Sequence, residues 1–193
     1  LMLVGQGVEL AGAREELLAL AEKAQIPFGQ TMLGLSAAPT SHPLNMGMLG
    51  MHGNLAPNVM TNQCDLLIAV GMRFDDRVTG DLHTYAKQAK VIHFEIDPSE
   101  VGKIVKPTVA VLGDCKQTLA QVTELVQETK HQAWIDGFKP YAEKEYNKVI
   151  DAALNPKEGP LLMGEVVRRV SEAANNEAIM VTDVGQNQLF GCR

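Results

Sequence analysis

Short apolar runs recur along the chain, and glycine or an acidic residue closes most of them. The clearest run is Asp65–Gly71, in which DLLIAVG has no polar residue after the first. A continuous apolar run of this length predicts a strand that is buried on both faces of a parallel sheet. We predict four further strands by the same reasoning, of which the second is weakened by its proline and glycine: Leu1–Val4, Pro27–Thr31, Lys90–Ile96 and Thr108–Leu112.

Apolar residues at helical spacing lie between these runs. One helix is predicted over Ala11–Ala24 and another over Cys115–Glu128, with short helices near Pro57 and after Asp97. Strands that alternate with helices predict an α/β fold with a doubly wound, mostly parallel, Rossmann-like sheet. Residues 34–53 are rich in Gly, Pro and Met and are predicted to be irregular. Irregular stretches of this length in compact domains are usually functional.

The chain changes character after residue 130. Residues 131–150 carry aromatic residues among lysines and glutamates, which indicates a helical segment packed on the domain surface. A second break at 155–160 precedes a predicted helix, Leu161–Ala174, and a predicted strand, Ala178–Thr182. These elements indicate the start of another α/β unit. Both ends of the sequence are expected to be cuts, because the chain starts inside a strand and stops as a new unit begins.

Composition narrows the class of protein. Hydrophobic residues make up 46% and charged residues 21% of the chain, as in globular proteins. The net charge of −6 argues against nucleic acid or an anionic membrane as the main partner. No apolar run is long enough to span a bilayer. Three widely spaced cysteines favour a reducing cytoplasm, and the histidines lack metal-ligand spacing, so no metal site is predicted.

Glycine and polar residues gather where the predicted strands end. Ligands of open α/β sheets bind at the carboxyl ends of the strands. Every end carries a candidate segment: Gly5-Gln6-Gly7, Thr31–Gly34, Gly71–Val78, Glu95–Asp97 and Gly113-Asp114. Their repetition predicts a ligand site along this edge of the sheet.

The first of these segments resembles the start of a dinucleotide fingerprint. Leu10 stands at the third glycine position, and Gln30-Thr31 stand where an acidic residue is expected. An ordinary NAD site is therefore not expected. The alternative role for Gly5 and Gly7 is a left-handed turn that requires glycine.

Two segments carry more specific chemistry. In residues 47–53, GMLGMHG, glycines allow a close backbone approach and methionines offer an apolar surface for a planar ring, although methionine is also common core filler. His52 is more often a hydrogen-bonded structural residue than a catalyst. In residues 73–78, RFDDRV, two arginines are suited to a pyrophosphate, with a solvated ion-pair cluster as the alternative.

The remaining strand ends are ambiguous between capping and binding. Glu95 and Ile96 are placed to meet an adenosine, whereas Asp97 is predicted to cap a helix, and Asp114 suits either role. The sequence contains no G-x-S-x-G elbow, no Walker loop and no Cys-His pair in a recognisable setting. A binding domain therefore explains the residues better than an active site, and no catalytic residue is predicted.

Together these motifs resemble the central domain of acetolactate (acetohydroxyacid) synthase catalytic subunits. The matching segments are TMLGLSAAPTSHPLNMGMLGMHG (31–53), DLLIAVGMRFDDRVTG (65–80), VIHFEIDPSEVGK (91–103) and GDCKQTL (113–119). The family uses thiamine diphosphate and Mg²⁺ to decarboxylate pyruvate and joins the two-carbon unit to a second 2-oxo acid, pyruvate or 2-oxobutyrate. This reaction supplies branched-chain amino acid biosynthesis. Its central domain holds FAD, which performs no net redox step.

The resemblance implies a role for residues at each strand end. The implied FAD contacts are Gly5, Gln6, Gly7, Thr31, Met32, Leu33, Gly50, Met51, His52, Gly71, Met72, Arg73, Asp75, Arg77, Val78, Glu95, Ile96 and Asp114. The implied lining of the substrate channel is Met51, Asp76 and Arg77. DVGQNQLF (183–190) resembles the opening of the family's pyrophosphate-binding domain, which implies thiamine diphosphate contacts at Val184, Gly185, Gln186 and Asn187. The chain departs from the family pattern at Gln6, at Ser36 and at Asn187, which replaces a histidine.

The resemblance also implies a division of the chain. Residues 1–130 would form the central FAD-binding domain, 131–159 a helical linker, and 160–193 the truncated start of the pyrophosphate-binding domain. The glutamate that activates thiamine and the GDG…N metal motif would lie elsewhere, so the chain alone is expected to be inactive. A cytoplasmic homo-oligomer, with a possible regulatory small subunit, is expected for the whole enzyme.

Two other interpretations stay open at this stage. One is a related thiamine diphosphate enzyme, such as a sulfoacetaldehyde acetyltransferase, a glyoxylate carboligase or an oxalyl-CoA decarboxylase relative. The other is a standalone nucleotide-binding regulatory module. The RFDDR segment favours acetolactate synthase over the related enzymes, and the expected cuts at both ends argue against a standalone module.

Overall fold

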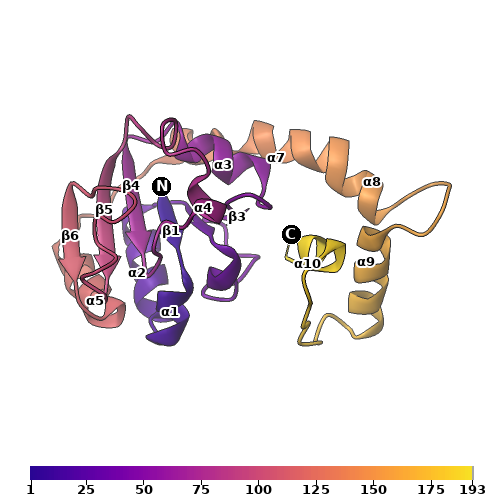
Figure 1. The fold of residues 1–193 in the computed structure, drawn as a ribbon, viewed down its shortest axis with the longest axis horizontal. Coiled ribbons are helices and arrows are strands. Elements are labelled where there is room, and N and C mark those ends of the chain that lie inside the picture. Colours follow the sequence, from indigo (N-terminus) through magenta and orange to yellow (C-terminus); the bar gives the residue numbers. More distant parts are fainter. Residues whose placement is uncertain (193) are drawn as a thin grey trace.

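A six-stranded sheet organises the N-terminal part of the protein (Figure 1). The structure is a computed structural model that describes residues 1–192. All strands are parallel and lie in the order β3-β2-β1-β4-β5-β6. Their bounds are β1 Met2–Val4, β2 Phe28–Gln30, β3 Asn45–Met48, β4 Leu66–Val70, β5 Lys90–Glu95 and β6 Val109–Leu112. The predicted doubly wound α/β fold is confirmed, with every strand pair parallel.

Helices cover both faces of the sheet because successive side chains along the buried strands point alternately into two apolar cores. Met2 and Val4 of β1 belong to the core beneath α1, α2 and α5, whereas Leu3 belongs to the core beneath α3. The helices on the first face are α1 Gln6–Leu10, α2 Arg14–Ala24 and α5 Cys115–Leu125. Leu17 of α2 and Leu119 of α5 are fully buried there. On the second face lies α3 Leu55–Thr61, with a loop that contains the short helix α4 Asp76–Thr79.

A chain of helices leads away from the sheet (Figure 1). It contains α6 Gln132–Asp136, α7 Lys139–Glu145, a π-helical turn over Tyr146–Ile150, α8 Asp151–Leu154, α9 Met163–Ala173 and α10 Gln186–Gly191. The helical character predicted for 131–150 and for Leu161–Ala174 is confirmed. Phe138 is buried in the second core, so the start of this segment is anchored to the sheet domain. No helix among the described residues has the length and apolar character that crossing a lipid bilayer requires.

The structure corrects four sequence predictions. Residues 34–53 are not wholly irregular, since they contain β3 at the edge of the sheet. Helix α1 begins directly after Gly5, ahead of the helix predicted from Ala11. No helix follows Asp97, whose side chain accepts from the backbone N–H of Ser99 at 2.8 Å and forms a turn. Ala178–Thr182 forms no strand.

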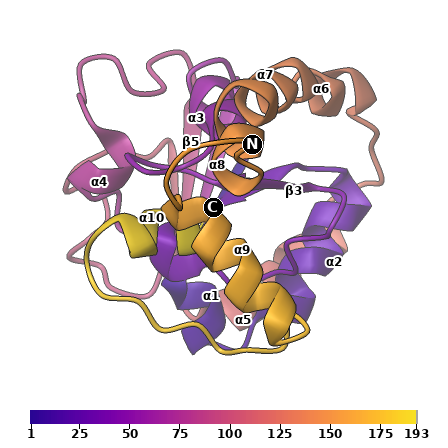
Figure 2. The ribbon, with the colours of Figure 1, turned by 90° about the vertical axis from the view of Figure 1, so that its right-hand side faces the viewer.

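The last correction has a physical reason. Within residues 1–192, no strand lies beside 178–182, and an isolated extended segment has no partner for its backbone hydrogen bonds. Ile179 is 94% exposed and Val181 is 90% exposed, so the apolar side chains that suggested a strand are not buried. The segment leads back toward the sheet, and α10 lies between α9 and the sheet domain (Figures 1 and 2).

Candidate functional site

The site is built around the place where the backbone just after β1, at Gly5 and Gly7, passes close to the backbone just after β4, at Gly71; this contact is called the glycine crossing below. In the observed strand order, β1 and β4 are neighbours whose connections leave in opposite directions, which is where open α/β sheets bind ligands. The backbone N–H of Gly5 donates to Val70 O, and that of Gly7 donates to Gly71 O, both at 2.9 Å. A Cβ on Gly7 would lie 2.6 Å from Gly71 Cα. Only glycine therefore fits this crossing.

This crossing rules out one of the roles considered for the first glycines. Neither Gly5 nor Gly7 has a positive φ, so the left-handed turn is the wrong explanation for them. Close backbone packing requires glycine at both positions. Gly71 needs glycine on both grounds, because its φ is +57° and its own Cβ would lie 2.7 Å from Gly7 Cα.

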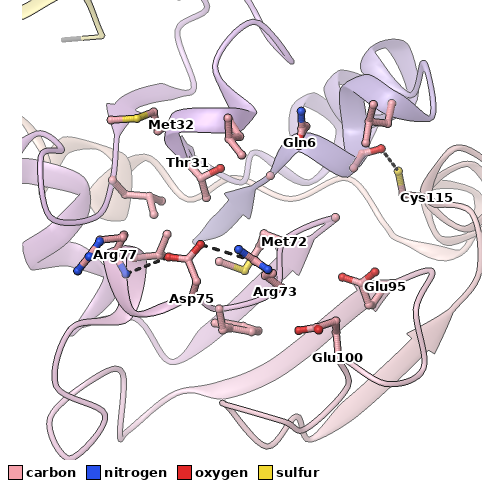
Figure 3. A pocket seen from close by; sticks show the side chains of 18 of the residues that line it. Gln6, Thr31, Met32, Met72, Arg73, Asp75, Arg77, Glu95, Glu100 and Cys115 are labelled. Carbon is pink, nitrogen blue, oxygen red and sulfur yellow. Dashed lines mark hydrogen bonds and ion pairs between the residues drawn. The ribbon is translucent and has the colours of Figure 1, made fainter. Parts of the chain in front are cut away.

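A cavity of about 940 Å³ opens along the carboxyl edge of the sheet. Residues from the ends of β1, β2, β4, β5 and β6 line it (Figure 3). The structure places around this one cavity every predicted FAD residue except Gly50. Gly50 lies behind the wall, where its N–H donates to Asn58 Oδ1 at 2.8 Å. Asp76, predicted for the substrate channel, is also outside the lining, whereas Met51 and Arg77 are part of it.

One end of the cavity is apolar. It is lined by Met32, Leu33, Met48, Leu49 and Met51, from the ends of β2 and β3. Leu33 is 67% and Met51 is 59% exposed, although both are large apolar side chains. Apolar side chains held open around a cavity suit a flat ring system.

Arg73 lies in the middle of the cavity (Figure 3), whereas Arg77 lies beside Met51 at the apolar end, where its carbonyl oxygen accepts from the N–H of Met51 at 2.7 Å. Arg73 Nε lies 3.9 Å from Asp75 Oδ2, and the Arg73 side chain remains 69% exposed (Figure 3). Asp75 caps α4, since its Oδ1 accepts from the backbone N–H of Arg77 at 2.9 Å. Arg77 Nη1 pairs with Asp76 Oδ2 at 3.3 Å. The aspartates therefore hold the segment in shape and leave the guanidinium of Arg73 open to the cavity.

The opposite end carries carboxylates. Glu95 is buried, and its Oε1 accepts from the backbone N–H groups of Ile96 at 2.8 Å and Asp97 at 3.1 Å. Glu100 lines the cavity nearby (Figure 3). Hydrogen bonds from Ser99 lower the pKa of Asp97 below its ordinary value. Carboxylate oxygens at this end suit a ligand that presents hydroxyl groups.

A buried histidine, His93, packs behind the carboxylate end of the cavity. His93 Nε2 lies 2.8 Å from Met72 O, and because a carbonyl only accepts, that nitrogen must carry the proton. The same nitrogen lies 3.7 Å from Glu95 Oε2, and the ring meets Phe74 edge to face. His93 therefore ties the segment after β4 to the end of β5. His52, by contrast, is exposed on the cavity wall.

Sequence reasoning missed a thiol in the lining. Cys115 follows Asp114 directly, and its Sγ lies 3.3 Å from Gly7 O (Figure 3). Burial, and then the charge of Asp114, raise the pKa of the Cys115 thiol to about 11, so it is neutral at physiological pH. Asp114 caps α5 by accepting from the N–H of Lys116 at 2.8 Å and also lines the cavity. The same strand-end rule that singled out Asp114 could have found its neighbour.

The residues matched to thiamine diphosphate lie mostly outside this cavity. Of Val184, Gly185, Gln186 and Asn187, only Val184 lines the cavity. Gln188, which was not predicted, lines it too, and its Nε2 lies 3.4 Å from Met32 Sδ. Among the described residues, no group of three His, Cys, Asp or Glu side chains could hold a metal ion.

Comparison with known proteins places this architecture in a family. The sequence model of the thiamine pyrophosphate enzyme central domain matches residues 1–122. The chain belongs to the thiamine pyrophosphate enzyme family. The lining residues from Gly5 to Cys115 lie within the matched residues, whereas Val184 and Gln188 lie outside them.

Relatives of this thiamine pyrophosphate enzyme central domain share one description. The acetolactate synthase large subunit of Parasynechococcus marenigrum is 42% identical over all of this chain and 31% of its own length. The probable acetolactate synthase large subunit of Methanocaldococcus jannaschii is 39% identical over 98% of this chain and 33% of its own. The acetolactate synthase isozyme 1 large subunit of Escherichia coli is 38% identical over 97% of this chain and 32% of its own length. The resemblance drawn from the motifs is thus confirmed, and the chain spans about a third of each relative.

Proposed function

We propose that this chain is the FAD-binding central part of an acetolactate synthase large subunit. The whole enzyme would decarboxylate pyruvate and join the two-carbon unit to pyruvate or 2-oxobutyrate. The observation that carries the proposal is the single cavity at the carboxyl edge, lined by all but one of the matched FAD residues. Residues 1–130 are the proposed central domain, 131–159 the linker, and 160–193 the start of the pyrophosphate-binding domain.

The polarity along the cavity suggests how FAD would lie. The carboxylates of Glu95 and Glu100 fit the ribose hydroxyls of the adenosine. The glycine crossing and the open guanidinium of Arg73 fit the pyrophosphate, which needs close backbone and bidentate donors. The methionine-lined end fits the flavin ring. Because Gly5 and Gly7 leave no room for a Cβ, the crossing brings the backbone of β1 and β4 together in the middle of the site.

The chain's own residues would bind and orient such a ligand through the cavity lining. When bound in the whole enzyme, thiamine diphosphate would supply the carbanion chemistry of the family. Here only Val184 among its matched residues reaches the cavity.

A titration with FAD tests the proposal directly. The chain should bind FAD and change its flavin emission, with a lower Kd than for ADP or FMN, because FAD alone spans both ends of the cavity. Fluorescence titration of the flavins and calorimetry with ADP measure the three affinities. Absence of any FAD binding, or binding no tighter than ADP, would contradict the proposal.

We also predict that the chain alone makes no acetolactate. Among the described residues, no group of three His, Cys, Asp or Glu side chains could hold a metal ion. The family resemblance also implies that the glutamate that activates thiamine lies elsewhere in the whole enzyme. The measurement is product formation from pyruvate with thiamine diphosphate, Mg²⁺ and FAD, using a full-length acetolactate synthase large subunit as the positive control. Turnover above background would refute this part of the proposal.

A further inference from the structure

One wall of the cavity is a short loop, and its support comes from outside the cavity. The wall loop, Leu49–Gly53, follows β3 and carries Met51 and His52 into the lining. On the inner side, the N–H of Met51 donates to Arg77 O at 2.7 Å. Gly50 takes a φ of +100°, which lets the loop turn sharply. A loop of this kind needs partners for its remaining backbone groups if it is to keep one shape.

Asn58 supplies those partners from α3. Its Oδ1 accepts the N–H of Gly50 at 2.8 Å, and its Nδ2 donates to Gly50 O at 2.9 Å. One amide side chain thus satisfies both backbone groups of one residue, as a neighbouring strand would. Asn54 acts beside it, accepting the N–H of Met48 at 2.9 Å through Oδ1. The position of the wall loop therefore follows the position of α3.

The position of α3 is in turn fixed by a residue 90 positions away. Asn54 makes no side-chain capping bond at the N-terminus of α3. The buried Glu145 of α7 takes this role: its Oε2 accepts the N–H of Leu55 at 2.8 Å and lies 3.4 Å from Asn54 Nδ2. A carboxylate at a helix N-terminus is favoured by the helix dipole. Helices α3 and α7 lie side by side in both views of the fold (Figures 1 and 2).

We propose that Asn58 and Glu145 are positioning residues for the flavin-ring end of the cavity. Through α3, they hold the wall loop so that Met51 faces the ring. Neither residue lines the cavity, so both act through the loop. The inference rests on the proposed FAD site and adds that the helical segment after residue 130 sets the shape of that site.

The test compares FAD with ADP, which lacks the flavin ring. Asn58→Ala should raise the Kd for FAD about tenfold, because two hydrogen bonds that fix the loop are lost. The Kd for ADP should change by less than about twofold, because the adenosine end is untouched. Flavin emission at saturation should shift toward that of free FAD. Asn58→Asp should behave like Asn58→Ala, since a second carboxylate oxygen would face Gly50 O.

Glu145 provides a second route to the same result. Glu145→Ala should weaken FAD binding about three- to fivefold and leave ADP binding intact, while Glu145→Gln, which keeps an acceptor for Leu55, should restore most of the affinity. Gln63→Ala is the matched control, because the Nε2 of Gln63 joins the far end of this region to Tyr141 Oη at 3.3 Å, away from the cavity. This control should bind FAD like the unchanged chain.

The outcomes separate the two proposals. If the unchanged chain binds no FAD, both the proposed function and this inference are wrong. If it binds FAD and the alanine variants keep the same affinity and emission, only the positioning role is wrong. Equal weakening of FAD and ADP would also overturn that role, because it would indicate general damage to the fold. Should Asn58→Ala fail to fold, the Glu145 pair decides the question.

Discussion

Alanine at position 7 should lower the free energy of unfolding by about 3 kcal/mol or more, because backbone, and not a movable side chain, fills the space that its Cβ needs. The new Cβ would lie 2.6 Å from Gly71 Cα and 3.0 Å from Gly71 O. To admit it, β1 and β4 would have to separate and lose the hydrogen bond from Gly7 to Gly71. FAD binding should fall with stability, since the crossing is the centre of the site.

Thermal unfolding by circular dichroism or calorimetry checks this prediction. For a chain of this size, the expected loss corresponds to a fall in Tm of about 6–12 °C. Gly12→Ala is the control, because Gly12 has a φ of +58° and no atom within 4 Å of a built Cβ. It should cost only the left-handed backbone, about 1–2 kcal/mol. Equal losses for the two variants would show that the crossing is not tightly packed.

Arg73→Ala should raise the Kd for FAD by about 10- to 100-fold, the range expected for one charge-assisted hydrogen bond to a phosphate. Stability should hardly change, since the ion pair of Arg73 with Asp75 spans 3.9 Å at an exposed site. Arg73→Lys should recover only part of the affinity, because lysine lacks the planar fork that meets two phosphate oxygens.

Fluorescence titration at several salt concentrations measures this effect. Added salt should weaken FAD binding by the unchanged chain more than by Arg73→Ala, because the variant has lost an attraction that salt screens. Arg14→Ala is the control: Arg14 pairs with Glu9 at 3.6 Å on the surface and does not line the cavity. If Arg14→Ala and Arg73→Ala weaken binding alike, the effect reflects net charge alone and the pyrophosphate assignment is wrong.

The sheet was largely predictable because its central strands are buried on both faces. Such strands must be apolar throughout, as in Leu66–Val70, so they can be predicted from their own residues without knowledge of the neighbouring strands. The strand-end rule then placed most of the cavity lining, because parallel strands bring their carboxyl ends to one edge. The rule also predicted lining residues in the segments after β5 and β6, although the polar residues of those segments could equally have been helix caps.

The edge strand β3 could not be predicted from its own residues. Asn45–Met48 contains a glycine and an asparagine and shows no strand pattern, and its pairing with β2 is irregular. Its neighbour, and the side chains of Asn45 and Asn54, fix it in place. Ala178–Thr182 shows the reverse case, an apolar and β-prone segment that has no partner strand among the described residues.

The residues that hold the cavity wall in place could not be predicted from the sequence for a related reason. Asn58 and Glu145 act across 8 and 90 residues, respectively, through hydrogen bonds that no local pattern encodes. Gln188 lines the cavity only because a distant element, α10, folds back onto it. Local sequence thus indicates which residues face a ligand better than which residues hold them there.

The place of β1 in the middle of the sheet has a consequence for how the protein forms. The ribosome makes Met2–Val4 before either of its neighbours, and β4 is completed only at Val70. Until then the backbone N–H and C=O groups along one edge of β1 have no partner strand, and pairing them requires contacts between distant parts of the sequence, which slows folding. A nascent chain paused before residue 66 would therefore expose an unpaired edge of a buried strand, a feature that favours aggregation.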